Sequence, residues 1–165
     1  EARRTAPELA ALEIVEAGGA SIVSFNMSEE DLLALMRKPW MMTSSDGGMA
    51  LPGEGRPHPR NNGAVTRKLT RYVRDRGAVS IEDAIRSMTS LPASTFGIEG
   101  RGAIAPGAFA DIAVFDPAAL RERATYEDPH QMSEGMWLVI VNGTPAIENG
   151  AFTGARAGRV LRPAR

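Results

Sequence analysis

The sequence of 165 residues contains no cysteine, which excludes a disulfide framework, a thiolate nucleophile and zinc-finger spacing. It contains only two histidines, His58 and His130. Because a catalytic zinc site normally takes about three protein ligands from histidine, cysteine or carboxylate, this chain cannot build a histidine-rich site alone. No run approaches the roughly 18 apolar residues of a transmembrane helix, and no signal peptide is recognisable. We therefore expect a cytoplasmic protein.

The sequence also lacks an excess of charge of either sign, since 19 Lys and Arg face 20 Asp and Glu. Without a basic excess to neutralise phosphates or anionic lipid, we expect neither a nucleic-acid nor a membrane partner. Arginines do cluster between residues 67 and 76, but Asp75 interrupts them and they follow a helical pattern. This arrangement is typical of a solvated helix face rather than of a binding patch.

The first part of the chain predicts helices and strands in alternation. The capping-box spacing at Thr5 predicts a helix over 6–17, and the apolar stretch 20–25 predicts a buried strand. A short helix that continues to Met36 follows a cap at Ser28. Residues 40–43 then predict a second buried strand. Strand, helix, strand is the unit of a parallel sheet with right-handed crossovers.

A long loop over 44–62, rich in glycine and proline, separates this part from two helices. The pattern predicts these helices over 63–76, ended by Gly77, and over 81–90, with a further helical turn that stops at Gly97. Loops of this length in compact domains are usually functional or disordered. The start of this loop at a strand's carboxyl end favours a functional role.

After residue 98 the sequence pattern predicts β-strands only. We expect strands over 111–115 and 137–141, and the dipeptide Asn142-Gly143 predicts a hairpin into a short strand over 144–148. The natural domain boundary therefore lies near Ile98.

Asp46 is the first candidate for chemistry, because it follows the expected strand 40–43 directly. Sites in parallel α/β folds form at the carboxyl ends of strands. An aspartate there can ligate a divalent metal or accept a proton from a metal-bound water. Alone, however, an aspartate before Gly47-Gly48 is more often a turn residue.

His58 and Arg60 lie in the same loop, where Pro57 and Pro59 stiffen the backbone. The Arg60 guanidinium could hold a carboxylate bidentately. The alternative is that both are ordinary exposed side chains. We expect His130, which has no partner motif, at the surface.

Several motifs, taken in order and with their spacing, resemble the C-terminal part of the D-aminoacylases, the N-acyl-D-amino-acid deacylases of the amidohydrolase superfamily. The motifs are Ser45-Asp46-Gly47, His58-Pro59-Arg60, Met88-Thr89-Ser90-Leu91-Pro92-Ala93, Arg101-Gly102 with Ile104, Pro106-Gly107 and Ala110-Asp111-Ile112. The resemblance extends over essentially the whole chain.

The resemblance implies an α/β fold in which residues 1–97 are the last strand-helix units of a catalytic (β/α)8 TIM-like barrel, and residues 98–165 are the C-terminal part of a small β-domain. It implies hydrolysis of the amide bond of N-acyl-D-amino acids at a zinc site. Asp46 would match the final-strand aspartate, which binds or faces the metal, activates the water as general base and then protonates the leaving amine. Arg60 would bind the substrate carboxylate, and His58 would help to fix the loop. The other ligands of the family, several histidines and a cysteine, belong to upstream segments.

Two positions depart from the family pattern: Ser44 stands where glycine is common, and Asn62 stands where an aromatic residue is common. Both leave the acyl and side-chain specificity open. Another amidohydrolase, such as a dihydroorotase-like cyclic-amide hydrolase, could use the same aspartate. The isolated chain could also be a non-catalytic fragment or an interaction module. We expect the remainder of the same enzyme as its partner and leave homo-oligomerisation open.

Overall fold

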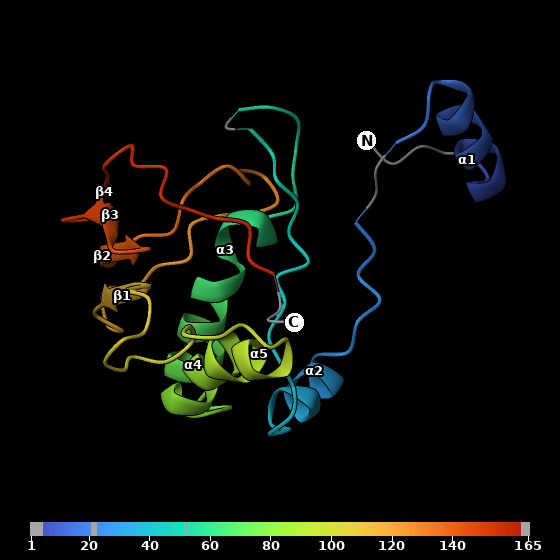
Figure 1. The fold of residues 1–165 in the computed structure, drawn as a ribbon. Helices are drawn as coiled ribbons and strands as arrows, with labels where there is room; N and C mark the ends of the chain where they lie inside the picture. Colours follow the sequence, from blue (N-terminus) through green and yellow to red (C-terminus); the bar gives the residue numbers. More distant parts are fainter. Residues whose placement is uncertain (1–4, 21–22, 52, 163–165) are drawn as a thin grey trace.

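The computed structural model describes residues 5–20, 23–51 and 53–162, with helices in the first part and a sheet in the last (Figure 1). The helices are α1 (Pro7–Glu16), α2 (Glu29–Met36), α3 (Arg60–Arg67), the π-helix η1 (Lys68–Asp75), α4 (Ile81–Met88) and α5 (Ser90–Thr95). The strands are β1 (Ile112–Phe115), β2 (Met136–Val141), β3 (Thr144–Glu148) and β4 (Ala151–Phe152). Within the described ranges, no helix combines the length and the apolar character needed to cross a membrane.

The two N-terminal helices form where the sequence predicts them. Pro7 opens α1, where its missing N–H is not needed. Ser28 Oγ accepts the N–H of Asp31 at 3.3 Å and so begins α2. Neither helix contains a buried residue. In Figure 1, α1 stands apart from the other helices and from the sheet.

The two expected parallel strands are not found. Residues 21–22 of the first lie outside the described residues, and its described positions, 20 and 23–25, are not in a strand. Residues 40–43 are not in a strand either, so this prediction is wrong. A strand needs a neighbouring strand for its N–H and C=O groups, whereas the N–H of Thr43 donates to the carbonyl of Ser87 in α4 at 2.9 Å. No parallel pair occurs among the strands of the described chain.

Helices α3 and η1 follow each other without a break and together replace the helix expected over 63–76. The helix starts at Arg60, so the loop ends three residues earlier than predicted. Gly77 ends it at φ 56°, with its N–H on the carbonyl of Val73. Next, Ser80 Oγ accepts the N–H of Asp83 at 3.0 Å and begins α4.

The core lies between these helices and the sheet. Its buried centre is Leu69 of η1, Ala84 of α4 and Leu120, which comes after β1. Around the centre pack Val73, Val79, Ile85, Met88, Phe115 and Met136. The core therefore joins the second helical part to the sheet.

The sheet is antiparallel, in the order β1-β2-β3-β4, and confirms the three strands that the sequence predicts. Asn142 and Gly143 both have positive φ, 48° and 80°, as a two-residue hairpin turn requires. The short strand β4 was not predicted. It follows Asn149-Gly150, a second dipeptide of the same kind, with φ of 51° and 78°.

Candidate functional site

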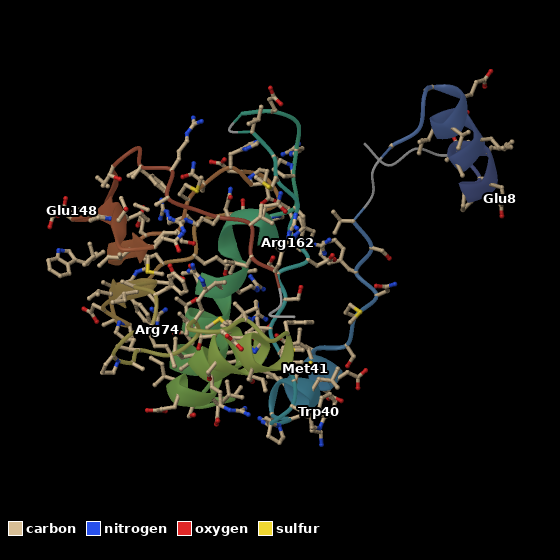
Figure 2. The ribbon with its side chains drawn as sticks, viewed as in Figure 1. Glu8, Trp40, Met41, Arg74, Glu148 and Arg162 are labelled. Carbon is tan, nitrogen blue, oxygen red and sulfur yellow. The ribbon has the colours of Figure 1, made fainter. Side chains whose placement is uncertain are left out.

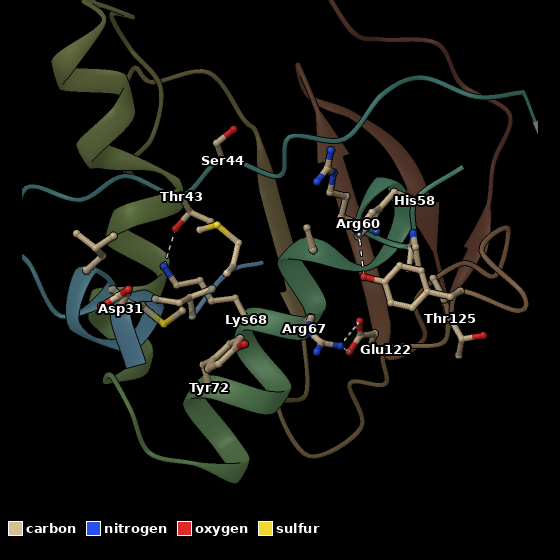
Figure 3. A pocket seen from close by; sticks show the side chains of 18 of the residues that line it. Asp31, Thr43, Ser44, His58, Arg60, Arg67, Lys68, Tyr72, Glu122 and Thr125 are labelled. Carbon is tan, nitrogen blue, oxygen red and sulfur yellow. Dashed lines mark hydrogen bonds and ion pairs between the residues drawn. The ribbon is translucent and has the colours of Figure 1, made fainter. Parts of the chain in front are cut away.

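A pocket of about 660 Å³ lies between α2, the segment 41–44, the helix α3–η1 and the segment 122–127 (Figure 3). Its apolar wall comes largely from methionine and leucine side chains of α2 and the segment before Asp46. These side chains are Leu32, Leu35, Met36, Met41 and Met42. The lining also includes polar groups, among them His58, Arg60 and Lys68. An apolar cavity with a few convergent polar groups is the usual form of a small-molecule site.

Asp46 lies just outside the residues that line this pocket, two residues after Ser44, which does line it. Its backbone has φ 48°, a conformation uncommon for a residue other than glycine. Arg60 Nη2 lies 2.8 Å from Asp46 Oδ2, in an ion pair whose side chains are 42% and 82% exposed. Because such exposed pairs contribute only about 0–1 kcal/mol to stability, this pair does little to hold the fold together.

The glycines after Asp46 let the loop lie directly against the start of α3. A Cβ on Gly47 would come within 3.1 Å of Asn61 Cα. The N–H of Gly48 donates to Asn61 Oδ1 at 3.0 Å. The loop backbone therefore lies close to α3 at these glycines, and this contact holds Asp46 beside Arg60.

His58 connects the loop both to α3 and to the segment before β2. Its Nδ1 accepts the N–H of Arg60 at 3.1 Å, and its Nε2 lies 3.2 Å from the hydroxyl of Tyr126. Since Nδ1 is an acceptor, the neutral ring carries its proton on Nε2 and donates to Tyr126. Burial and the charge of Arg60 lower the pKa of His58, although Asp46 opposes this shift. The structure thus brings Asp46, His58 and Arg60 together.

The sequence predicts His130 at the surface, where the structure places it half-buried and with partners in the loop. Its Nε2 lies 3.2 Å from the carbonyl oxygen of Gly55, and its Nδ1 accepts the N–H of Gly53 at 3.4 Å. It is half-buried and ties the glycine-rich loop to the segment before β2. Contacts far apart in sequence produce this role, and no local motif announces it.

Lys68 is a further polar residue of the pocket that sequence reasoning missed. It is only 7% exposed, and its Nζ donates to Thr43 Oγ1 at 2.5 Å and to Ser87 Oγ at 2.7 Å (Figure 3). Burial lowers the pKa of the Lys68 amine. A signal for it does exist, because Ala64, Lys68 and Tyr72 share one helical row, where a lysine stands between two less polar residues.

The described residues do not by themselves form a metal site. No three His, Asp or Glu side chains among them gather closely enough to hold an ion. Asp46 offers one carboxylate, and its neighbour at 2.8 Å is a cation rather than another ligand. A metal at Asp46 therefore needs further ligands from outside the described part of the chain.

Comparison with known proteins relates the chain to hydrolases. The sequence pattern of the amidohydrolase family matches residues 11–147. A D-aminoacylase from Alcaligenes xylosoxydans xylosoxydans is 44% identical over 142 residues, which are 86% of this chain and 29% of that protein. A dihydroorotase from Lactobacillus johnsonii is 35% identical over 92 residues, 56% of this chain and 21% of that protein.

A solved structure gives the same relation in three dimensions. The N-acyl-D-glutamate deacylase from Bordetella bronchiseptica, complexed with zinc and a phosphonate mimic of the tetrahedral intermediate, superposes with a TM-score of 0.73 at 42% identity. The match covers 82% of this chain and 28% of that one. The chain thus spans less than a third of the length of these relatives.

Proposed function

Because the chain belongs to the amidohydrolase family, we propose that it is part of an enzyme that hydrolyses the amide bond of N-acyl-D-amino acids and that Asp46 is a carboxylate of the catalytic site. The observation that carries this proposal is the juxtaposition of Asp46 with Arg60 at 2.8 Å beside a largely apolar pocket. The carboxylate could transfer protons, and the guanidinium could bind the carboxylate of a substrate. The relatives that act on N-acyl-D-amino acids support the choice of substrate.

We further propose that residues 1–97 are the last strand-helix units of a barrel, whose strands would form only against neighbouring strands from the rest of the enzyme, and that residues 98–165 are part of a small β-domain. The change from helices to an antiparallel sheet between α5 and β1 supports a boundary there. The remaining units would lie in parts of the enzyme outside this chain. As isolated, the chain would therefore be inactive.

Asp46 would be one ligand of a zinc site whose other ligands come from those parts. A bound divalent ion would lower the pKa of a water molecule toward about 7. The Asp46 carboxylate would accept the proton that this water loses, and would then deliver it to the leaving amine. The solved relative with bound zinc supports the choice of metal.

Arg60 would hold the substrate carboxylate. A guanidinium carries five N–H donors, so the contact of Nη2 with Asp46 still allows a carboxylate to bind from the pocket side. Arg60→Ala should raise KM by about tenfold or more, as expected for a lost charged contact. Arg56→Ala in the same loop is the matched control. An unchanged KM would remove Arg60 from this role.

A dihydroorotase-like cyclic-amide hydrolase is the second candidate, and the Lactobacillus johnsonii relative favours it. A substrate panel on the complete zinc-loaded enzyme separates the two. We expect hydrolysis of N-acetyl-D-amino acids and none of dihydroorotate. The reverse result would establish the cyclic-amide reaction.

A further inference from the structure

Lys68 occupies a position that does not serve stability. An ammonium group removed from water is destabilising unless a counter-charge compensates it. In the described part of the chain, the partners of Lys68 Nζ are two neutral hydroxyls, those of Thr43 and Ser87. An apolar side chain of similar length would fill the same space without this cost. Packing therefore does not explain why a lysine stands at this position.

The two hydroxyls join three separate segments at this point. Thr43 belongs to the stretch before Asp46, Ser87 to α4 and Lys68 to η1. Thr43 Oγ1 and Ser87 Oγ also lie 3.1 Å apart, and Ser87 Oγ donates to the carbonyl of Ala84 at 2.7 Å. In Figure 3 the Lys68 side chain points directly at Thr43. Lys68 of η1 thus donates both to α4, at Ser87, and to the segment that precedes Asp46, at Thr43.

The same helix contacts that stretch a second time, at Arg60. Lys68 and Arg60 are eight residues apart on the continuous helix α3–η1, which corresponds to about 12 Å along its axis. Thr43 and Asp46 are three residues apart, so the chain between them spans at most about 10 Å. The segment 43–46 therefore runs beside the helix. Its buried attachment is the bond of Lys68 to Thr43, while the exposed ion pair of Arg60 with Asp46 adds little.

We propose that Lys68 is a positioning residue, which fixes the segment 43–46 through Thr43 so that the Asp46 carboxylate is presented in one place. The inference rests on the proposed function of Asp46. It assigns to Lys68 no contact with substrate. An aspartate that transfers protons loses rate when it is displaced by a fraction of an ångström, whereas substrate affinity depends on other contacts.

The test uses Lys68→Met in the complete zinc-loaded enzyme, with Lys38→Met as the matched control. We expect kcat for an N-acetyl-D-amino acid to fall about tenfold and KM to stay within about twofold. The melting temperature should be unchanged or higher, because a buried charge is replaced by an apolar side chain. Amide exchange at Thr43, whose N–H bonds Ser87, should become faster. A purely structural lysine would instead lower the melting temperature and leave kcat unchanged.

Thr43→Val keeps the test decisive if Lys68→Met folds poorly. It removes the acceptor on the segment and should lower kcat as Lys68→Met does, while Thr43→Ser should restore it. The double variant Lys68→Met/Thr43→Val should be no slower than either single variant. Wild-type kcat in Thr43→Val would overturn the inference. If Asp46→Asn abolishes turnover while these variants retain it, only the role of Lys68 fails; if Asp46→Asn also retains turnover, the proposed function fails.

Discussion

The helices of residues 5–51 and those of residues 60–97 form by the same local rules but differ in burial. Ser28 caps α2 as Ser80 caps α4. Among the described residues of 5–51, none is buried, whereas the later part contains the core residues Leu69 and Ala84, which pack with Leu120 from beyond β1. Local signals are therefore sufficient to define a helix, but a core requires a partner surface. Without such a partner surface, the first part leaves large apolar side chains exposed.

Several polar contacts join the two parts. Glu29 of α2 forms ion pairs with Arg71 and Arg76 of the second part, at 2.8 and 3.0 Å. Arg37 and Arg86 each donate to a backbone carbonyl across the same boundary. Large apolar side chains of the first part stay exposed, and Figure 2 shows Trp40 at the edge of the molecule. Exposed apolar faces of this kind usually mark an interaction surface, in agreement with the proposal that the rest of the enzyme covers them.

The largest expected difference in stability between the two parts comes from truncating a core leucine. Leu120→Ala should lower the free energy of unfolding of the core region by about 2–5 kcal/mol, because Leu120 is 1% exposed and its truncation leaves a cavity. Leu12→Ala in α1, where the leucine is 65% exposed, should change it by no more than about 0.5 kcal/mol. Amide exchange at Ala84 and at Ala10 reports the two regions separately. Equal losses in both would mean that α1 is buried as deeply as the core.

A smaller difference is expected at the two helix caps. Ser80→Ala should destabilise the core region by about 1 kcal/mol, since α4 packs into it. Ser28→Ala should instead open α2 locally, which leaves the stability of the core unchanged. Exchange at the amides of Asp83 and Asp31, the two capped groups, measures this. A core destabilised equally by Ser28→Ala would show that the two parts fold as one cooperative unit.

The smallest effect concerns pH and the loop between the two parts. The pKa of His58 is lowered by burial and by Arg60, so the fold favours the neutral ring. Its contribution to stability is complete above about pH 6.5, the ordinary pKa of histidine. That contribution is lost as the pH falls through the lower pKa of the folded state. The neutral variant His58→Gln should lack this loss when both proteins are unfolded thermally between about pH 7.5 and pH 5. A His58 pKa above the ordinary value would reverse the sign.

Local features could be predicted from the sequence, and features that depend on distant contacts could not. The caps at Ser28 and Ser80 and the hairpin at Asn142-Gly143 depend on neighbours within a few residues. Residues 40–43 have the composition of a strand, but their backbone bonds an α4 carbonyl instead. The second Asn-Gly turn, at Asn149, carries the same local signal.

The candidate site divides along the same line. Asp46 and Arg60 could be found because each lies in a short motif, although their ion pair depends on how the loop folds back on α3. The partners of Lys68 and His130 are too distant in sequence for any motif to indicate them. Residue types thus identified candidate chemistry, and tertiary structure decided which groups meet.

Turnover of an N-acetyl-D-amino acid by Asp46→Asn in the complete zinc-loaded enzyme tests the central claim most directly. Glu54→Gln, an exposed carboxylate in the same loop, is the matched control. We predict that kcat falls by about 100-fold or more, as expected for a lost proton-transfer group, with the fold retained and the control unaffected. Near-normal turnover in Asp46→Asn would contradict the account.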